Sequence, residues 1–210
     1  MKKLFLAIAL IAISIPTFSQ VKVSPGLRLG LNASTITNHN DSGRLIGFSG
    51  AMFVNLHLSR FYELQPEMTY SNQGFKGGNY TYIDPYYGDV IHVNGNDVNI
   101  HYLGLSIANK FFVSPEIGLH FIIGLSLYIN VSDNSNGDIT PADVSFFGGI
   151  GYEFPMGLGI EARYKQGFVD VRDGYYDDYY YDNNYDNEYY NGNNKLNSVF
   201  QFSVYYKFGM

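Results

Sequence analysis

Apolar and polar residues alternate along most of this chain, in eight segments whose connections are by turns short and long. Alternation of this kind is typical of a β-strand, because successive side chains point to opposite faces of a sheet. The connections after the second, fourth and sixth segments span only residues 59–60, 113–116 and 155–157, whereas the others are long. We therefore predict strands at residues 25–34, 45–58, 61–71, 97–112, 117–131, 142–154, 158–169 and 197–208.

The regular exchange of short and long connections predicts how these strands are joined. A closed antiparallel barrel in a bacterial outer membrane has tight turns at one rim and longer loops at the other. The segments also suit a tilted membrane crossing, which needs about 9 to 11 residues per strand. We predict an all-β fold, an eight-stranded antiparallel up-and-down transmembrane β-barrel, with long external loops at about residues 72–96 and 170–196.

Alternation does not by itself say which face lies inside. A soluble lipocalin-like carrier would place its apolar face inside, whereas a membrane barrel places it outside. The polar face of this chain carries charges of both signs, which favours a packed lumen of paired charges over a face in water. We predict a lumen ion-pair network of Arg28, Glu63, Glu67, Lys110, Glu153, Glu161, Arg163 and Lys207.

Aromatic residues gather near the ends of the predicted strands, as they do at the two interfaces of a membrane. The expected girdle comprises Tyr62, Tyr70, Tyr152, Phe154, Tyr206 and Phe208. The last strand also places apolar residues on one face and ends near an aromatic residue, either as a C-terminal signal for the barrel-assembly machinery or simply as an amphipathic closing strand. The residues of this predicted signal are Phe202, Val204, Tyr206 and Phe208.

The amino terminus predicts export. Lys2 and Lys3 precede an apolar run at residues 4–15, which is too short to span a bilayer as a helix and is followed by small residues. We predict a signal peptide at residues 1–19 and a mature chain at residues 20–210, located in the bacterial outer membrane. The chain has no cysteine, and its formal net charge of −6 disfavours nucleic acid as a partner.

Two long connections carry the candidate contact surfaces. Tyrosine and asparagine are favoured in adaptable binding loops, so the loop near residue 180 predicts recognition of an unknown protein partner. The alternatives are weak capture of a divalent cation by its carboxylates, or a mobile loop that only solvates the rim. The residues are Tyr175, Tyr176, Asp177, Asp178, Tyr179, Tyr180, Tyr181 and Asp182.

In the 72–96 loop, residues 90–93 and 98–101 flank Asn94 and Gly95, a strong turn dipeptide. This spacing predicts a hairpin that raises a stiff two-stranded blade beyond the membrane. An irregular lid is the alternative.

No pattern in the chain predicts an enzyme, a cofactor or a metal centre. Of the five histidines, His57 and His120 are expected on inward faces, His101 at a strand end, and His39 and His92 in loops. None stands in a spacing that argues for a nucleophile and base, although serines such as Ser71 and Ser106 are present. Because eight strands enclose a space just wide enough for side chains, we predict an ion-paired plug, with an ion or proton path as the alternative.

Four short sequence segments carry a resemblance to a known protein family. They are GLRLGLN at residues 26–32, LQPE at 64–67, YLGL at 102–105 and GYEFPMGLGIEARY at 151–164. In order and spacing they resemble the PorT-like outer-membrane β-barrel proteins of Bacteroidetes. The resemblance implies an eight-stranded barrel like OmpX or OmpA in contact with outer-membrane lipid, and a role as an accessory of protein export is the alternative function that it suggests. Our prediction is a non-enzymatic outer-membrane barrel whose external loops make surface contacts.

Overall fold

The computed structural model describes residues 21–38, 43–83, 87–114, 116–135, 139–171 and 194–209. The predicted signal peptide and the tyrosine-rich segment 175–182 lie outside the described residues. Within the described part of the chain, no helix is long and apolar enough to cross a membrane.

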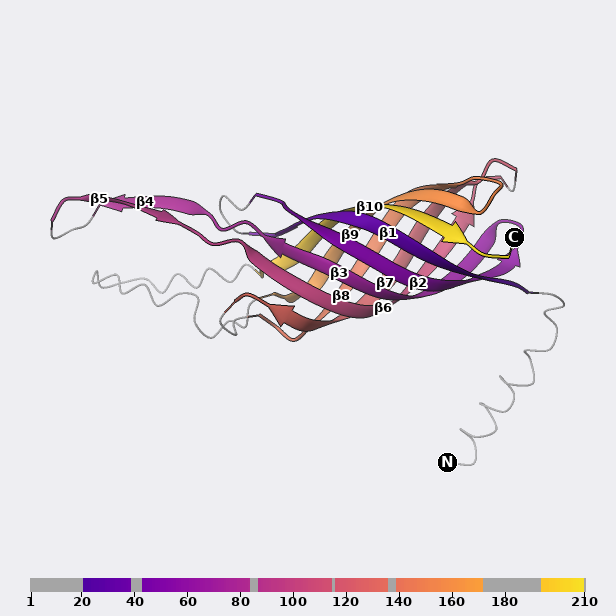
Figure 1. Ribbon diagram of the computed structural model, residues 1–210, viewed down its shortest axis with the longest axis horizontal. Helices are drawn as coiled ribbons and strands as arrows, with labels where there is room; N and C mark the ends of the chain where they lie inside the picture. The colour runs from indigo at the N-terminus through magenta and orange to yellow at the C-terminus, as the bar shows by residue number, and fades with distance from the viewer. Residues whose placement is uncertain are drawn as a thin grey trace, which may run out of the picture.

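The described residues form ten β-strands, eight of which close into a barrel (Figure 1). Around the barrel the strands follow the order β1, β10, β9, β8, β7, β6, β3, β2, and every neighbouring pair is antiparallel. The strands are β1 Lys22–Ile36, β2 Leu45–Ser59, β3 Tyr62–Phe75, β4 Asn79–Ile83, β5 Val90–Asn94, β6 Val98–Phe112, β7 Leu119–Asp133, β8 Ala142–Glu153, β9 Leu158–Asp170 and β10 Leu196–Lys207.

The predicted eight-stranded barrel is confirmed, and it closes through its first and last strands. Gly26 is opposite Lys207 and Ile36 is opposite Asn197 in the β1–β10 ladder. The largest difference from the predicted boundaries is at β3, which runs to Phe75 because its ladder with β6 continues until Phe75 is opposite Val98. Closure gives every strand two partners, so no barrel strand leaves an edge exposed.

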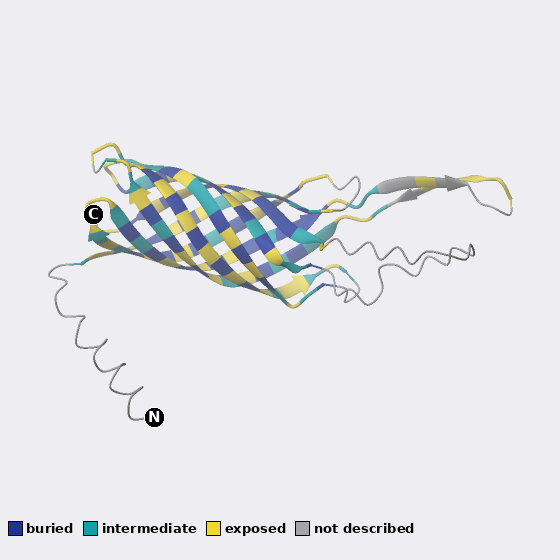
Figure 2. Ribbon diagram, turned by 180° about the vertical axis from the view of Figure 1, so that it is seen from behind, coloured by how far each residue is buried: buried dark blue, intermediate teal, exposed yellow. Residues whose placement is uncertain are grey.

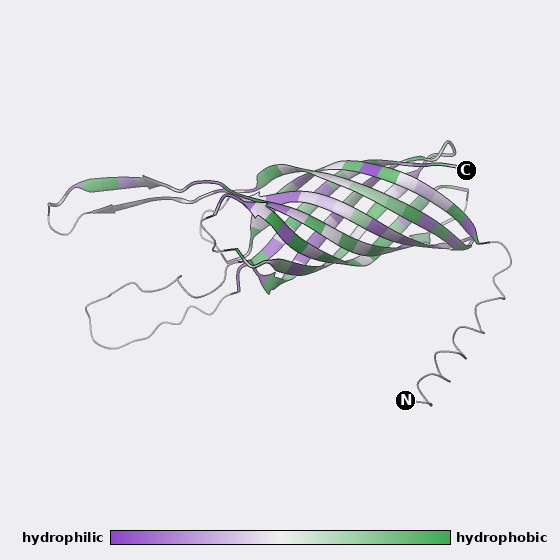
Figure 3. Ribbon diagram, turned by 60° about the horizontal axis from the view of Figure 1, so that its bottom comes forward, coloured by the Kyte–Doolittle hydropathy of each residue, from purple (hydrophilic) through white to green (hydrophobic). Residues whose placement is uncertain are grey.

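The barrel is apolar outside and polar inside, as Figures 2 and 3 show by the alternation of exposed and buried positions and of hydropathy along each strand. On β1, Leu29 is 73% exposed, whereas its neighbour Arg28 is 3% exposed. On β3, Met68 points outward and Glu67 inward. The predicted faces are therefore confirmed. The soluble carrier alternative is wrong, because such a carrier would bury these apolar side chains and expose the charged ones.

Short connections define one end of the barrel, which we call the short-turn rim, and the opposite end is the long-loop rim. At the β8–β9 turn Gly157 has a φ of 83°, a conformation that glycine adopts at little cost. The turn is closed by hydrogen bonds from the Phe154 amide to the Leu158 carbonyl, 2.8 Å, and from the Gly157 amide to the Phe154 carbonyl, 3.0 Å. At the β6–β7 turn, Gly118 also has a positive φ, and a Cβ there would overlap the carbonyl oxygen of Glu153.

Glycines on the inward face make room for aromatic rings that fill the lumen. Each of these glycines is directly opposite an aromatic residue on the neighbouring strand, and a Cβ on the glycine would overlap that ring. A ring that covers a glycine on the adjacent strand restores the apolar contact that the glycine lacks. The pairs are Gly26 with Phe53, Gly104 with Tyr128, Gly124 with Phe147 and Gly159 with Tyr205.

An apolar cluster lies across the inside of the long-loop rim, and we call it the apolar cap. It joins the ends of the strands to one residue from each of two connections, and its members are at most 8% exposed. Its members are Ile36, Phe75, Ile100, Tyr102, Tyr128, Ile139 and Val171.

Beyond this rim, β4 and β5 form a separate two-stranded antiparallel sheet, the β4–β5 ribbon (Figure 1). Asn79 is opposite Asn94 and Ile83 is opposite Val90. A two-stranded blade was predicted, but its pairing was wrong, because residues 98–101 belong to β6 and pair with the end of β3. The continuing β3–β6 ladder takes up these residues, so the Asn94–Gly95 dipeptide lies at the base of the ribbon rather than at its tip.

We expect a charge on the outer wall to destabilise the barrel according to its depth. Leu125 points outward at the middle of β7, so Leu125→Arg should lower the free energy of unfolding in lipid vesicles by about 2 to 4 kcal/mol. The matched variant Val23→Arg, outward near the short-turn rim, should cost only about 0 to 1 kcal/mol. Guanidinium titration in vesicles measures both, and equal losses would contradict an outer wall immersed in hydrocarbon.

Candidate functional site

The barrel lumen brings together the eight charged residues that were predicted to form an ion-pair network. They come from β1, β3, β6, β8, β9 and β10, and we call them the lumen charge network. Their carboxylates and cations are equal in number, so each charge has an opposite charge available. The members are Arg28, Glu63, Glu67, Lys110, Glu153, Glu161, Arg163 and Lys207.

Glu67 is held between two guanidinium groups at the centre of the lumen. The two terminal nitrogens of Arg28 lie 2.7 and 2.6 Å from its two carboxylate oxygens, and those of Arg163 lie 3.2 and 2.9 Å away. Gln65 donates a further hydrogen bond of 2.8 Å. Paired N–H donors of arginine match the geometry of a carboxylate, so these contacts fix orientation as well as charge. The carboxylate therefore links β3 to β1 and β9 across the lumen.

Glu161 is the second centre of the network. The Nζ of Lys110 lies 2.6 Å from its Oε1, and Arg163 reaches its Oε2 at 2.7 Å. Arg28 lies 3.6 Å away, so it neighbours both central carboxylates. All these side chains are at most 3% exposed, and at such burial an unpaired charge would be costly.

Lys207 organises the part of the network nearest the short-turn rim. Its Nζ lies 2.9 Å from Glu63 and 2.6 Å from Glu153. Asn55 also donates to Glu63 at 2.8 Å, and the Nδ1 of His57 lies 3.1 Å from the same carboxylate. The side chain of His57 is 43% exposed, so the lumen is more open at this end than at its centre.

Some lumen groups that complete the network were not predicted as members. Tyr205 donates a hydrogen bond of 2.8 Å to Glu153, and its ring lies 4.2 Å from the Nζ of Lys110. The Nδ1 of His120 lies 3.0 Å from the Gly118 carbonyl oxygen, and its Nε2 lies 3.8 Å from Glu161. Inward position on a strand was the available signal for both.

Two charged residues on the inward face stand apart from the network. Lys165 donates a hydrogen bond of 2.8 Å to the Tyr128 hydroxyl and lies over the rings of Tyr128 and Phe147. Asp143 contacts Asn197 rather than a base. Alternation locates such residues on the inward face but does not reveal which of them find partners.

The predicted girdle residues occupy both ends of the barrel. Ring pairs near the short-turn rim are Tyr152 with Phe154 and Tyr206 with Phe208, at 4.9 and 5.2 Å between centroids. Tyr62 packs on Phe111 at the same end, whereas Tyr70 stacks on His101 toward the long-loop rim. The residues of the predicted assembly signal, Phe202, Val204, Tyr206 and Phe208, are all outward and exposed. Their recognition by assembly machinery stays a prediction.

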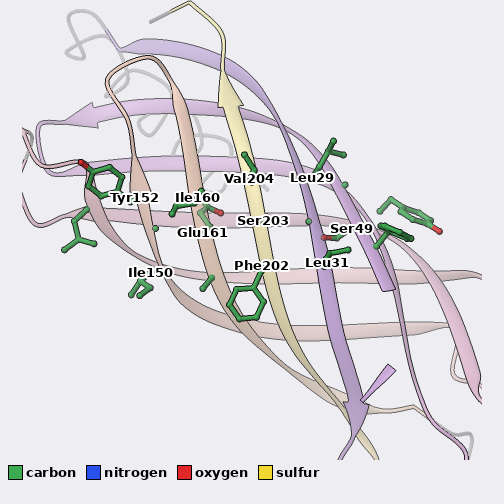
Figure 4. Close-up of a pocket in the computed structure, with 17 residues that line it drawn as sticks. Leu29, Leu31, Ser49, Ile150, Tyr152, Ile160, Glu161, Phe202, Ser203 and Val204 are labelled. Carbon is green, nitrogen blue, oxygen red and sulfur yellow. The ribbon is translucent and has the colours of Figure 1, made fainter. Parts of the chain in front are cut away.

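A shallow depression of about 920 Å³ lies on the outer wall and crosses β10 (Figure 4). Outward apolar side chains form it, whereas the polar residues along it, Ser49, Glu161 and Ser203, are buried and belong to the inward face. An apolar surface of this kind suits contact with hydrocarbon. Its labelled apolar lining in Figure 4 includes Leu29, Leu31, Ile150, Ile160, Phe202 and Val204.

The described histidines and the two serines considered above do not form a catalytic arrangement. Ser106 is hydrogen-bonded to Ser126 at 2.8 Å, and Ser71 accepts from Asn32 at 2.9 Å. His101 contacts Tyr70 and His92 contacts Thr81. In the described ranges no three residues among His, Cys, Asp and Glu converge as a metal centre.

Comparison with known proteins agrees with this architecture. The sequence model of one protein family, described as "Outer membrane protein beta-barrel domain", matches residues 18–173. The structure resembles the crystal structure of Neisserial surface protein A (NspA) with a TM-score of 0.52 and 13% sequence identity, covering 90% of this chain and 100% of NspA. At this identity the likeness concerns the fold alone.

The structure is also similar to Ail, the attachment invasion locus protein of Yersinia pestis, solved in complex with the heparin analogue sucrose octasulfate. That similarity has a TM-score of 0.46 and 9% identity, and covers 89% of this chain and 99% of Ail. A comparison with curated proteins gave no match.

We expect removal of one central charge to destabilise the barrel strongly. Glu67→Gln keeps the side-chain shape but leaves two buried guanidinium groups short of a counter-charge, so it should lower the free energy of unfolding by about 3 to 5 kcal/mol. Glu116→Gln, the same change at an exposed position in a short turn, should lie within about 0.5 kcal/mol of wild type. Denaturant unfolding in detergent measures both, and indistinguishable variants would show that the Glu67 pairs contribute nothing.

Proposed function

Because this chain belongs to the outer membrane protein beta-barrel domain family and lies in the bacterial outer membrane, we propose that it is a non-enzymatic barrel with a closed lumen, whose external parts contact a partner protein. The observation that carries this proposal is the contrast between a lumen filled with paired charges and a two-stranded ribbon that projects beyond the barrel (Figure 1).

A closed lumen is supported by the packing of the inward face. Eight strands enclose a space that side chains can fill, and here the filling consists of paired charges and aromatic rings. The apolar cap lies over this filling at the long-loop rim. A barrel built in this way serves as a membrane-anchored support rather than as a diffusion channel.

The β4–β5 ribbon supports contact outside the membrane, because the long-loop rim of such barrels faces the cell exterior. The ribbon follows the β3–β6 ladder along the chain as a separate sheet, and its described side chains are mostly exposed, with Val90 58% exposed. Thr81 and His92 pair across the ribbon at 2.8 Å. A two-stranded sheet has two free edges and is marginally stable alone, so a partner that adds a strand would stabilise it.

The tyrosine- and aspartate-rich residues 175–182 are proposed as a second contact element, on the basis of their composition. The finer assignment to the PorT-like family, and with it the alternative of an accessory role in protein export, rests on the sequence resemblance alone.

In planar bilayers, we expect the purified barrel to show no unitary conductance. The ion-paired lumen leaves no continuous path, so Glu161→Gln should be equally silent although it removes a buried charge. A porin inserted under the same conditions provides the positive control. Discrete channel openings in the wild-type protein would overturn the closed lumen.

For the external contact, we expect a photoreactive amino acid at Thr81 or His92 to yield protein adducts in intact cells. The same probe at Leu125, which points outward in mid-strand, should yield adducts with lipid alone. A variant lacking residues 175–190 then separates the contribution of the loop from that of the ribbon. Failure of both ribbon positions to capture protein would contradict the proposed contact.

A further inference from the structure

Asp143 is a buried carboxylate without a cationic partner. It points inward on β8 near the long-loop rim and is 4% exposed. Its Oδ2 accepts a hydrogen bond of 2.9 Å from the Nδ2 of Asn197, and the backbone amides of Val144 and Val169 lie near the carboxylate, but its Oδ1 makes no hydrogen bond of ordinary geometry among the described residues. Lys165, which is also on the inward face, donates to Tyr128 instead. An ionised carboxylate in such a position needs a positive charge beside it, because burial otherwise favours the protonated form.

The surroundings of Asp143 hold further oxygen atoms that lack a donor. The Oδ1 of Asn197, a residue that is 1% exposed, and the Oδ1 of Asn130 are buried and unpartnered within the described ranges. The Tyr102 hydroxyl lies 3.4 Å from Asn197, and Asn130 is opposite Tyr102 in the β6–β7 ladder. Asn130 also donates to Asp133 at 2.6 Å, which brings a second carboxylate beside the group. The two unpartnered amide oxygens, of Asn130 and Asn197, can only accept hydrogen bonds or bind a cation.

Two irregularities of the sheet flank this group. The β6–β7 register shifts between His101 and Tyr102, beside Asn130, and the β9–β10 register shifts between Leu196 and Ser198, at Asn197. Such bulges redirect side chains and are frequent next to functional sites.

Gly167 keeps space free between Asp143 and Asn197. A Cβ at this position would lie 3.0 and 3.1 Å from the two carboxylate oxygens of Asp143 and 3.2 Å from the Cβ of Asn197. A larger residue would therefore press on both side chains. The glycine leaves a small space beside oxygen acceptors, beneath the apolar cap.

We propose that Asp143, Asn197, Asn130 and the Tyr102 hydroxyl form a binding site for one hard cation of the calcium class. Calcium takes carboxylate and amide oxygens in flexible geometry and completes its coordination with water. A cation supplies the positive charge that Asp143 lacks and at the same time satisfies the orphaned amide oxygens. This site is distinct from the acidic segment 175–182 and does not depend on the proposed contact with a partner.

Terbium, which replaces calcium and is sensitised by tyrosine, tests the site in the full-length barrel refolded in detergent. The chain has no tryptophan, so the emission would report tyrosine such as Tyr102. Wild type should show saturable emission that calcium displaces. Asp143→Asn should weaken binding by about tenfold or more. The matched control Asp89→Asn, an exposed acid near β5, should bind like wild type.

Two further variants keep the test decisive. Gly167→Ala removes no oxygen ligand but places a methyl group against Asp143 and Asn197, so it should also weaken binding. This variant replaces Asp143→Asn if the latter does not fold, as judged by whether its migration on SDS gels changes on heating. Neutralising Asp177, Asp178 and Asp182 together should leave the saturable component in place. The proposal is overturned if wild type shows no saturable binding, if the folded Asp143→Asn variant binds like wild type, or if neutralising the acidic segment abolishes the signal.

Discussion

Pairing of charges inside a closed sheet is the constraint on which this structure depends. The outer wall is apolar, so charged side chains of the strands must lie inside, where each needs a partner. Glu67 accepts hydrogen bonds from two arginines on strands that are distant in sequence, Arg28 on β1 and Arg163 on β9. A slip of one residue in any of these ladders would turn a charged side chain toward hydrocarbon. The buried charges therefore specify the register of the barrel, whatever their net contribution to its stability.

The closed barrel also requires that side chains fill the space in the lumen that the charge network leaves. Strand number and strand stagger together set the interior of a barrel, so bulky inward side chains require small ones beside them. The four glycine–aromatic pairs meet this requirement between adjacent strands, as where the ring of Tyr205 lies over Gly159. Tyr205 also reaches Glu153 and Lys110, so one side chain both fills volume and completes the charge network. Tyr205 thus contributes both to the packing of the lumen and to its charge network.

Strand faces could be predicted from the sequence because a strand has a period of two, and that period alone placed Glu161 and Arg163 inside. The choice of partners could not be predicted, since it depends on which strands face each other across the lumen. Lys165 illustrates the difference: alternation with Arg163 puts it on the inward face, but its contact with Tyr128 rather than a carboxylate is a property of the closed barrel. The hairpin was mispaired for a related reason. A local turn signal at Asn94 and Gly95 says nothing of the competing ladder that extends β3 to Phe75.

The arrangement also bears on where activity can lie in such a molecule. A lumen occupied by paired charges and covered by the apolar cap leaves little room for a solute to pass, and the outer wall is suited to lipid. Among the described residues, Thr81, Val90 and His92 of the β4–β5 ribbon are exposed beyond the long-loop rim and accessible to other molecules. The β4–β5 ribbon is a sheet of its own, joined to β3 and β6 by residues 76–78 and 95–97, so the barrel fixes where both of its chains leave the wall. The barrel is then more than an anchor, because the end of its β3–β6 ladder, where Phe75 is opposite Val98, brings the two chains of the ribbon together at their base.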